Sequence, residues 1–207
     1  ISEFFRPFFS GIFLEPELET SSRMFEFVYK MFGEGYATLP KGGIEAIPKQ
    51  LKSNLKHDKF KFNTKVKSVE DGKIILDDGN ELESDFTIIA TEYSKLVGNL
   101  KKIETKWKSC DTLYFETNIR TIRKPIIGLI AESDALINNI FYHSSILSKS
   151  TGRKQLLSVT IVKQHNLSKE DLKIRVQKEL QDYCGIDSCI FIKHYAIPNA
   201  LPDLDGI

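Results

Sequence analysis

The chain has 207 residues, of which 41% are hydrophobic and 28% charged, with 29 basic against 28 acidic side chains. The resulting net charge of +1 excludes a nucleic-acid binder whose affinity rests on a field of lysine and arginine. The apolar fraction excludes an acidic disordered protein, and a chain of this length buries roughly 70% of its unfolded surface on folding. The composition is that of an ordinary folded protein.

Aromatic residues crowd the first part of the chain. Residues 2–32 predict helices interrupted at Pro7, Gly11 and Pro16, and from Thr20 onward the apolar residues recur three and four positions apart. Two interpretations of the aromatic density stay open at this point. The rings pack in the core, or they form an apolar wall of a substrate cavity.

A Gly-Gly turn leads into the next predicted helix. Gly42 and Gly43 precede Ile44, Ile47 and Leu51, which fall on one helical face. A turn that leads into a helix N-terminus can accept a phosphate or another backbone, although a Gly-Gly pair alone carries little information. Lys41, next to the turn, is a candidate phosphate contact or an ordinary exposed lysine.

Residues 60–90 predict a β-meander. Asp71-Gly72 and Asp78-Gly79 have the composition of hairpin turns and separate short strands of alternating character. Residues 85–91 form a continuously apolar run, typical of a strand that is covered on both faces.

The second half predicts a sheet and one clear helix. Strands are expected at residues 113–116, 126–131, 139–143, 155–163 and 189–196, in an antiparallel or mixed sheet. Ser168 caps the helix with Asp171 in a capping box, and Gly185 ends it. Its buried stripe is formed by Leu172, Val176, Leu180 and Tyr183. Pro198 and Pro202 are expected to end the last strand.

No residues form a metal or catalytic motif. Cys110, Cys184 and Cys189 lack metal-ligand spacing and are interpreted as buried thiols of a reducing compartment. The four histidines lie far apart in the sequence, and the P-loop, GxSxG and zinc signatures are absent, as is GxGxxG after a strand. We therefore expect no metal and name no catalytic residue.

The order of these elements resembles a known group of enzymes. Residues 4–51, ending in LPKGGIEAIPKQL, followed by KFNTKVKSVE at 61–70 and DFTIIAT at 85–91, resemble FAD-dependent oxidoreductases of the amine oxidase and phytoene desaturase superfamily. The phytoene-dehydrogenase-related oxidoreductases of bacteria and plastids are the most similar group. HYAIPNALP at 194–202 resembles the segment that precedes the last flavin motif of these enzymes.

The resemblance implies roles for particular residues. Val66 would contact the adenine of FAD through its backbone, and Ala90, with Thr91 beside it, would lie close to the cofactor. Gly42 and Gly43 would bring the intervening helix against the flavin domain. The substrate-binding residues implied by the resemblance and the aromatic density together are Phe4, Phe5, Phe8, Phe9 and Phe13.

The family's N-terminal GxGxxG and C-terminal GD motif do not occur in this chain. Since the sequence also begins and ends in segments that are apolar or predicted to be structured, we expect a piece of a longer protein. It would comprise a helical part of the substrate-binding domain (1–38), a partial FAD-binding segment (39–91), and the sheet and helix of the substrate-binding domain (92–207). Without the diphosphate cradle, the isolated chain is expected to retain little or no FAD.

The expected fold is α+β, with a mixed sheet and helices on one face, plus a helix and small meander that belong to the FAD domain. The intact parent would oxidise a lipophilic substrate or an amine in the cytoplasm, without nucleic acid or metal. Desaturase, isomerase, amine oxidase and porphyrinogen oxidase activities are not separated by the sequence. The alternative is a non-catalytic domain that binds a lipophilic ligand. Exposed apolar surface near Ile88 and Ile89 would leave homodimerisation open, and association with a membrane surface also stays open.

Overall fold

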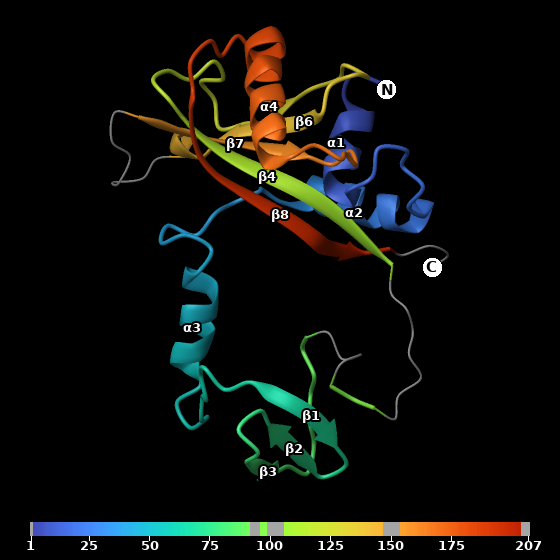
Figure 1. Cartoon of the computed structure of the whole chain (residues 1–207), viewed down its shortest axis with the longest axis vertical. Helices are drawn as coiled ribbons and strands as arrows, with labels where there is room; N and C mark the ends of the chain where they lie inside the picture. Colours follow the sequence, from blue (N-terminus) through green and yellow to red (C-terminus); the bar gives the residue numbers. More distant parts are fainter. Residues whose placement is uncertain (1, 92–95, 99–105, 147–153, 204–207) are drawn as a thin grey trace. The chain divides into compact units, whose positions relative to one another are not determined.

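The computed structural model describes residues 2–91, 96–98, 106–146 and 154–203, and the chain divides into two compact units (Figure 1). Unit 1 comprises residues 1–38 and 106–207, and unit 2 comprises residues 39–105. The described part contains four α-helices and two antiparallel sheets, so the predicted α+β class is confirmed.

Unit 1 is built on a five-stranded sheet in the order β5-β6-β7-β4-β8. Its strands are β4 (Trp107–Thr117), β5 (Gly128–Leu129), β6 (Ile137–Tyr142), β7 (Gln155–Ile161) and β8 (Ile190–Pro202). Every pairing between described strands is antiparallel, which corrects the expectation of a mixed sheet. The helix between β7 and β8 does return the chain parallel to β7, but β4 lies between these two strands, so no parallel pair forms.

One face of this sheet is covered by α4 (Lys169–Cys184), as Figure 1 shows. Ser168 caps the helix by accepting a hydrogen bond from the backbone N–H of Asp171 at 3.2 Å, and Gly185 ends it in a left-handed conformation, both as predicted. Three residues of the predicted stripe, Leu172, Val176 and Leu180, are buried and pack against side chains from β4, β6 and β7, whereas Tyr183 is only half-buried and lies outside this core. The resulting core contains Leu172, Val176, Leu180, Leu113, Phe115, Ile137, Ile140, Leu157 and Val159.

The edge strand β8 is longer than the sequence predicts. It continues through Pro198 and ends at Pro202, and Leu201 still pairs with Lys108 of β4. Proline is tolerated in an edge strand because its missing N–H can face solvent rather than a neighbouring strand. The prediction that Pro198 ends the strand was therefore wrong.

The N-terminal helices are α1 (Phe5–Phe13) and α2 (Ser22–Glu34). Gly11 lies inside α1 instead of interrupting it. The carbonyl of Pro7 accepts a hydrogen bond from Asn138 Nδ2 at 3.1 Å and ties α1 to β6. At the other end of α1, Lys108 of β4 bonds to Glu15 and Thr20 and so fixes the connection to α2.

Gly128 of β5 has neighbouring side chains so close that a larger residue would contact them. A Cβ added there would lie 2.5 Å from Ile122 Cδ1 and 3.0 Å from Ile140 Cγ1, in the core between β5 and β6. We expect Gly128→Ala to lower the free energy of unfolding by about 1–3 kcal/mol, measured by urea denaturation, because overpacking forces neighbours off their positions. Gly33→Ala is the control: the added methyl meets nothing within 4 Å, so α2 should be unchanged or slightly more stable. Equal stability of the two variants would contradict the prediction.

Unit 2 contains α3 (Ala46–Asn54) and the predicted meander, formed by β1 (Val66–Glu70), β2 (Lys73–Leu76) and β3 (Glu81–Glu83) in the order β1-β2-β3. Both predicted hairpin turns carry glycine at positive φ, +76° at Gly72 and +84° at Gly79. A residue with a Cβ is strained there, which is why the Asp-Gly pairs predict these turns.

Residues 85–91 do not form the strand that the sequence predicts. They are extended without pairing to any described strand, and Phe86 and Ile88 are each 94% exposed, whereas Ile89 is half-buried. A strand exists only where neighbouring strands complete its hydrogen bonds, and none of the described strands of unit 2 does so. The expected exposure of apolar surface is thus found at Ile88 and only partly at Ile89.

Candidate functional site

A pocket of about 710 Å³ lies in unit 2 between the start of β1 and the extended segment that follows β3. Lys65, Val66 and Lys67 form one wall, and Ile89, Ala90 and Thr91 form another. The structure thus brings together Val66, Ala90 and Thr91, three residues that the sequence analysis had linked to a cofactor from separate motifs.

The walls of this pocket are held by backbone hydrogen bonds. The Val69 N–H donates to the Leu96 carbonyl at 2.8 Å, which joins β1 to the chain beyond the extended segment. The Asp77 N–H donates to the Lys65 carbonyl at 2.9 Å and closes the β1–β2 end of the meander. Leu76 is buried beneath it. Val66 therefore lies at a fixed strand end and lines the pocket.

The Gly-Gly turn lies apart from the pocket. The Gly43 N–H donates to the Pro40 carbonyl at 2.9 Å, and the Gly43 carbonyl accepts from the Ala46 N–H at 3.0 Å at the start of α3. Gly43 has a φ of +81°, so its conformation requires glycine, whereas Gly42 does not have a positive φ. Neither glycine lines the pocket. Their proposed role toward the flavin domain stays a prediction.

The five candidate phenylalanines, Phe4 before α1 and four within it, differ in their exposure to solvent. Phe9 and Phe13 are buried, whereas Phe4 and Phe5 are exposed and Phe8 is half-buried. Their rings stack along the helix, and Phe8 and Phe9 contact Phe32 and Phe25 of α2 at centroid distances of 5.5 and 4.7 Å. Part of this aromatic density is therefore packing between α1 and α2. Contact with a substrate stays a prediction for the exposed rings.

The residues present fit one end of a dinucleotide cofactor. The pocket around Val66 and Ala90 is of the size of a small-molecule site, and most of the residues that line it are apolar or uncharged. Lys67 adds positive charge to its lining, whereas Lys65 pairs with Asp77, a further lining residue, at 3.3 Å. The fit does not extend to the diphosphate, because no glycine-rich turn between a strand and a helix borders this pocket within the described residues.

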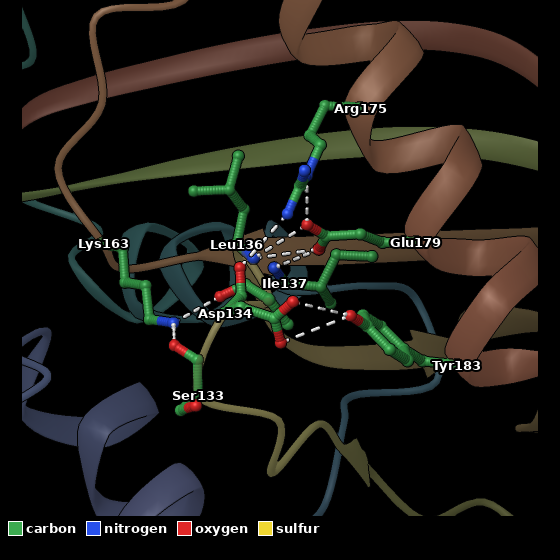
Figure 2. Close-up of polar contacts among 9 residues, drawn as sticks. Ser133, Asp134, Leu136, Ile137, Lys163, Arg175, Glu179 and Tyr183 are labelled. Carbon is green, nitrogen blue, oxygen red and sulfur yellow. Dashed lines mark hydrogen bonds and ion pairs between the residues drawn. The ribbon is translucent and has the colours of Figure 1, made fainter.

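A buried carboxylate that was not predicted from the sequence joins α4 to the start of β6 in unit 1 (Figure 2). Glu179 of α4 is 2% exposed and accepts hydrogen bonds from the backbone N–H groups of Leu136 and Ile137 at 2.9 Å and from Arg175 Nε at 2.6 Å. Tyr183 reaches Asp134 from the same helix. The signal was present in the sequence, because Glu179 occupies a position of the buried stripe, three residues after Val176.

Two histidines meet one carboxylate at the β4–β8 edge. His194 Nε2 lies 2.5 Å from Asp111 Oδ1, and His165 Nε2 lies 3.3 Å from Asp111 Oδ2 as an ion-pair contact. These residues are far apart in sequence, so spacing could not reveal the cluster. Nowhere in the described ranges are three or more His, Cys, Asp or Glu side chains arranged to hold a metal ion. Likewise, none of the described helices is long and apolar enough to cross a membrane.

All three cysteines are free and half-buried rather than fully buried. Burial raises the pKa of the Cys184 thiol to about 11, with Glu132 and Glu179 adding to the rise. We therefore expect Cys184 to react with iodoacetamide at pH 8 roughly 100-fold more slowly in the folded chain than in 6 M guanidinium, followed by mass spectrometry of the alkylated peptide. Equal rates in the two conditions would contradict this environment.

The same shift fixes the sign of a pH effect on stability. The thiol keeps its proton to a higher pH in the folded chain than in the unfolded chain. Its contribution to the free energy of unfolding is therefore complete below about pH 9 and is lost as the pH rises toward 11. Cys184→Ala should reduce that alkaline loss of stability.

The comparisons agree with this architecture. The family model for flavin-containing amine oxidoreductases matches residues 1–195. No curated protein matches the chain. Among solved structures, reduced UDP-galactopyranose mutase is 14% identical with a TM-score of 0.69, and the match covers 95% of this chain and 52% of that one.

Two further structures share the fold. An oxidoreductase from Methanosarcina mazei is 14% identical with a TM-score of 0.67, covering 92% of this chain and 51% of that chain. A putative protoporphyrinogen oxidase from Exiguobacterium sp. 255-15 is 18% identical with a TM-score of 0.57, covering 78% and 40%. The chain thus spans about half the length of the structures it matches. From the extent of the family match, the chain belongs to the flavin-containing amine oxidoreductases.

Proposed function

We propose that this chain is the substrate-binding part of an FAD-dependent oxidoreductase, together with one inserted part of its flavin domain. The whole enzyme would remove two electrons from a C–H bond of a lipophilic substrate or an amine. The division into two units, with residues 39–105 as a separate body between the two segments of unit 1, supports this assignment. So does the share of about half of each matched structure that the chain covers.

The observation that carries the proposal is the pocket of unit 2. Val66 and the pair Ala90-Thr91 come from motifs about two dozen residues apart, and they border one cavity. The resemblance had implied a cofactor contact for each of them. A structural role alone would give no reason for the three to share a pocket.

FAD would supply the two-electron chemistry when bound, and the described residues would bind and orient it. The Val66 backbone and the small side chain of Ala90 would accept the adenosine end, and Lys67 would provide positive charge near it, since Lys65 is paired with Asp77. In unit 1, the exposed rings of Phe4 and Phe5 suit contact with a lipophilic substrate.

A second candidate is a non-catalytic domain that binds a lipophilic ligand. The exposed aromatic side chains of α2 favour it, since Phe27 is 58% and Tyr29 60% exposed. A lipophilic ligand would cover such side chains without any need for a flavin. The two candidates differ in one readout, which is the flavin content of the complete gene product.

The test is expression of the complete product of the gene and measurement of bound flavin by its absorbance near 450 nm. The proposal expects a yellow protein with about one FAD per chain. It also expects the 207-residue chain alone to bind FAD weakly or not at all, because the diphosphate site is missing. A complete product that purifies without flavin and takes up none from added FAD would refute the proposal and leave the ligand-binding candidate.

The pocket itself is tested by filling it. In the complete product, Ala90→Leu should lower the FAD content at least severalfold, because the larger side chain occupies the space beside Val66. Ala37→Leu is the matched control, since Ala37 is exposed and lies outside unit 2. The same FAD content in both variants would remove Ala90 from the cofactor site.

A further inference from the structure

A second pocket, of about 370 Å³, lies in unit 1 at the end of the sheet. Three segments that are far apart in the sequence form it: α1 with the chain that follows, the connection from β5 to β6, and the residues directly after β7. Of the described strands only β6 contributes, through its first residues Ile137 and Asn138, so the pocket lies beyond the strand ends and not on a face of the sheet. None of the five candidate phenylalanines lines it.

Hydrogen bonds fix the wall that the β5–β6 connection forms. Lys163 Nζ donates to the carbonyls of Ser133 and Ala135 at 2.7 and 2.5 Å (Figure 2). Asn138 Nδ2 donates to the Pro7 carbonyl at 3.1 Å and so joins this wall to α1. Because these contacts exist within the chain itself, a ligand would enter a pocket that is already formed and would lose little affinity to ordering it.

Two opposite charges on this pocket lack a charged partner among the described residues. Lys163 forms no ion pair there, and its two neutral carbonyl acceptors leave one of its three N–H groups for a further acceptor. The side chain of Glu132, which also lines the pocket, forms no hydrogen bond or ion pair within the described ranges. The remaining charged lining residues, Arg6 and Glu17, already pair with each other at 3.5 Å.

Much of the remaining lining is apolar. It includes Pro7, Pro16, Ile130, Leu136 and Val162. An apolar body would lose contact with water against these side chains. A ligand with a single charge would be attracted by one of the two unpaired groups and repelled by the other, whereas a ligand with both charges can pair with each of them.

We infer that this pocket binds a small zwitterion with an apolar body, whose carboxylate accepts from the Lys163 ammonium and whose ammonium pairs with Glu132. The site is separate from the substrate contacts expected at the phenylalanines, and no step of the oxidation is assigned to it. It lies wholly within unit 1, so it does not depend on the flavin pocket of unit 2.

The test compares three probes of closely related carbon skeleton on the full 207-residue chain. L-leucine carries both charges, 4-methylpentanoate carries only the carboxylate, and 3-methylbutylamine carries only the ammonium. NMR titration at pH 7.5 and low salt should show that leucine binds roughly three- to tenfold more tightly than either other probe, the range of one charge-assisted contact at a partly exposed site. Equal affinities of the three probes, or no binding of leucine at millimolar concentration, would overturn the proposal.

A variant tests the anionic partner. Glu132 is exposed, so Glu132→Gln should fold normally, and in this variant leucine should bind no more tightly than 4-methylpentanoate. Glu170→Gln is the matched control, because Glu170 is also exposed and does not line the pocket, and it should keep the preference for leucine. The comparison of leucine with 3-methylbutylamine tests the Lys163 side without altering the loop that Lys163 holds. A preference for leucine that persists in Glu132→Gln would overturn the site.

Discussion

Replacing Glu179 by alanine should lower the free energy of unfolding of the chain by about 3–5 kcal/mol, because this buried carboxylate accepts hydrogen bonds from two backbone N–H groups that would lose their partner. The carboxylate satisfies the N–H groups of Leu136 and Ile137 at the start of β6 and also binds Arg175 (Figure 2). Without it, two N–H groups at a buried strand end lose their acceptor, and each such loss costs about 1–3 kcal/mol. Thermal denaturation followed by circular dichroism should show a midpoint about 10 °C lower.

The control lies on the same helix. Glu170 is exposed and pairs with Lys173 one turn away, so Glu170→Ala should change stability by no more than about 0.5 kcal/mol. Glu179→Gln should fall between the two, because the amide retains one acceptor oxygen and loses the charge that Arg175 faces. A midpoint of Glu179→Ala within 2 °C of the unaltered chain would show that the contact does not hold β6 in place.

The features that the sequence predicted are those encoded over a few residues. The helix at α4 follows from Ser168, the apolar stripe and Gly185, all within 18 residues, and the meander follows from its two Asp-Gly turns. The cofactor candidates Val66 and Ala90 came from a resemblance rather than from their chemistry. The pocket gives them a common place in the structure.

The features that the sequence could not predict depend on distant partners. The segment 85–91 has the apolar composition of a strand, but no described strand pairs with it. The sequence of a segment does not by itself determine whether another strand pairs with it. Pro198 remains in β8 because that strand lies at the sheet edge, a position that only the topology defines. The Asp111 cluster needs the register of β4 with β8, which pairs residues up to 95 positions apart.

Replacing Phe115 by alanine should destabilise unit 1 by about 3–5 kcal/mol, as expected for a large side chain removed from a closed core. Phe115 is 0% exposed on β4, between Leu157 of β7 and Phe191 of β8, and its ring meets that of Phe191 edge to face at 5.8 Å. Because β4 pairs with strands on both sides, the neighbours cannot collapse into the cavity without disturbing both pairings. Urea denaturation monitored by circular dichroism measures the loss.

The same substitution at Phe86, which is 94% exposed in unit 2, should leave the unfolding of unit 1 unchanged and serves as the matched control. A double-mutant cycle with Phe191→Ala should return a coupling of about 0.5–1.5 kcal/mol, the excess expected for an edge-to-face aromatic pair over simple burial. A coupling near zero would mean that β8 is held to the core by backbone pairing alone. A loss below about 1 kcal/mol for Phe115→Ala would contradict the packing of β4 as the centre of the sheet.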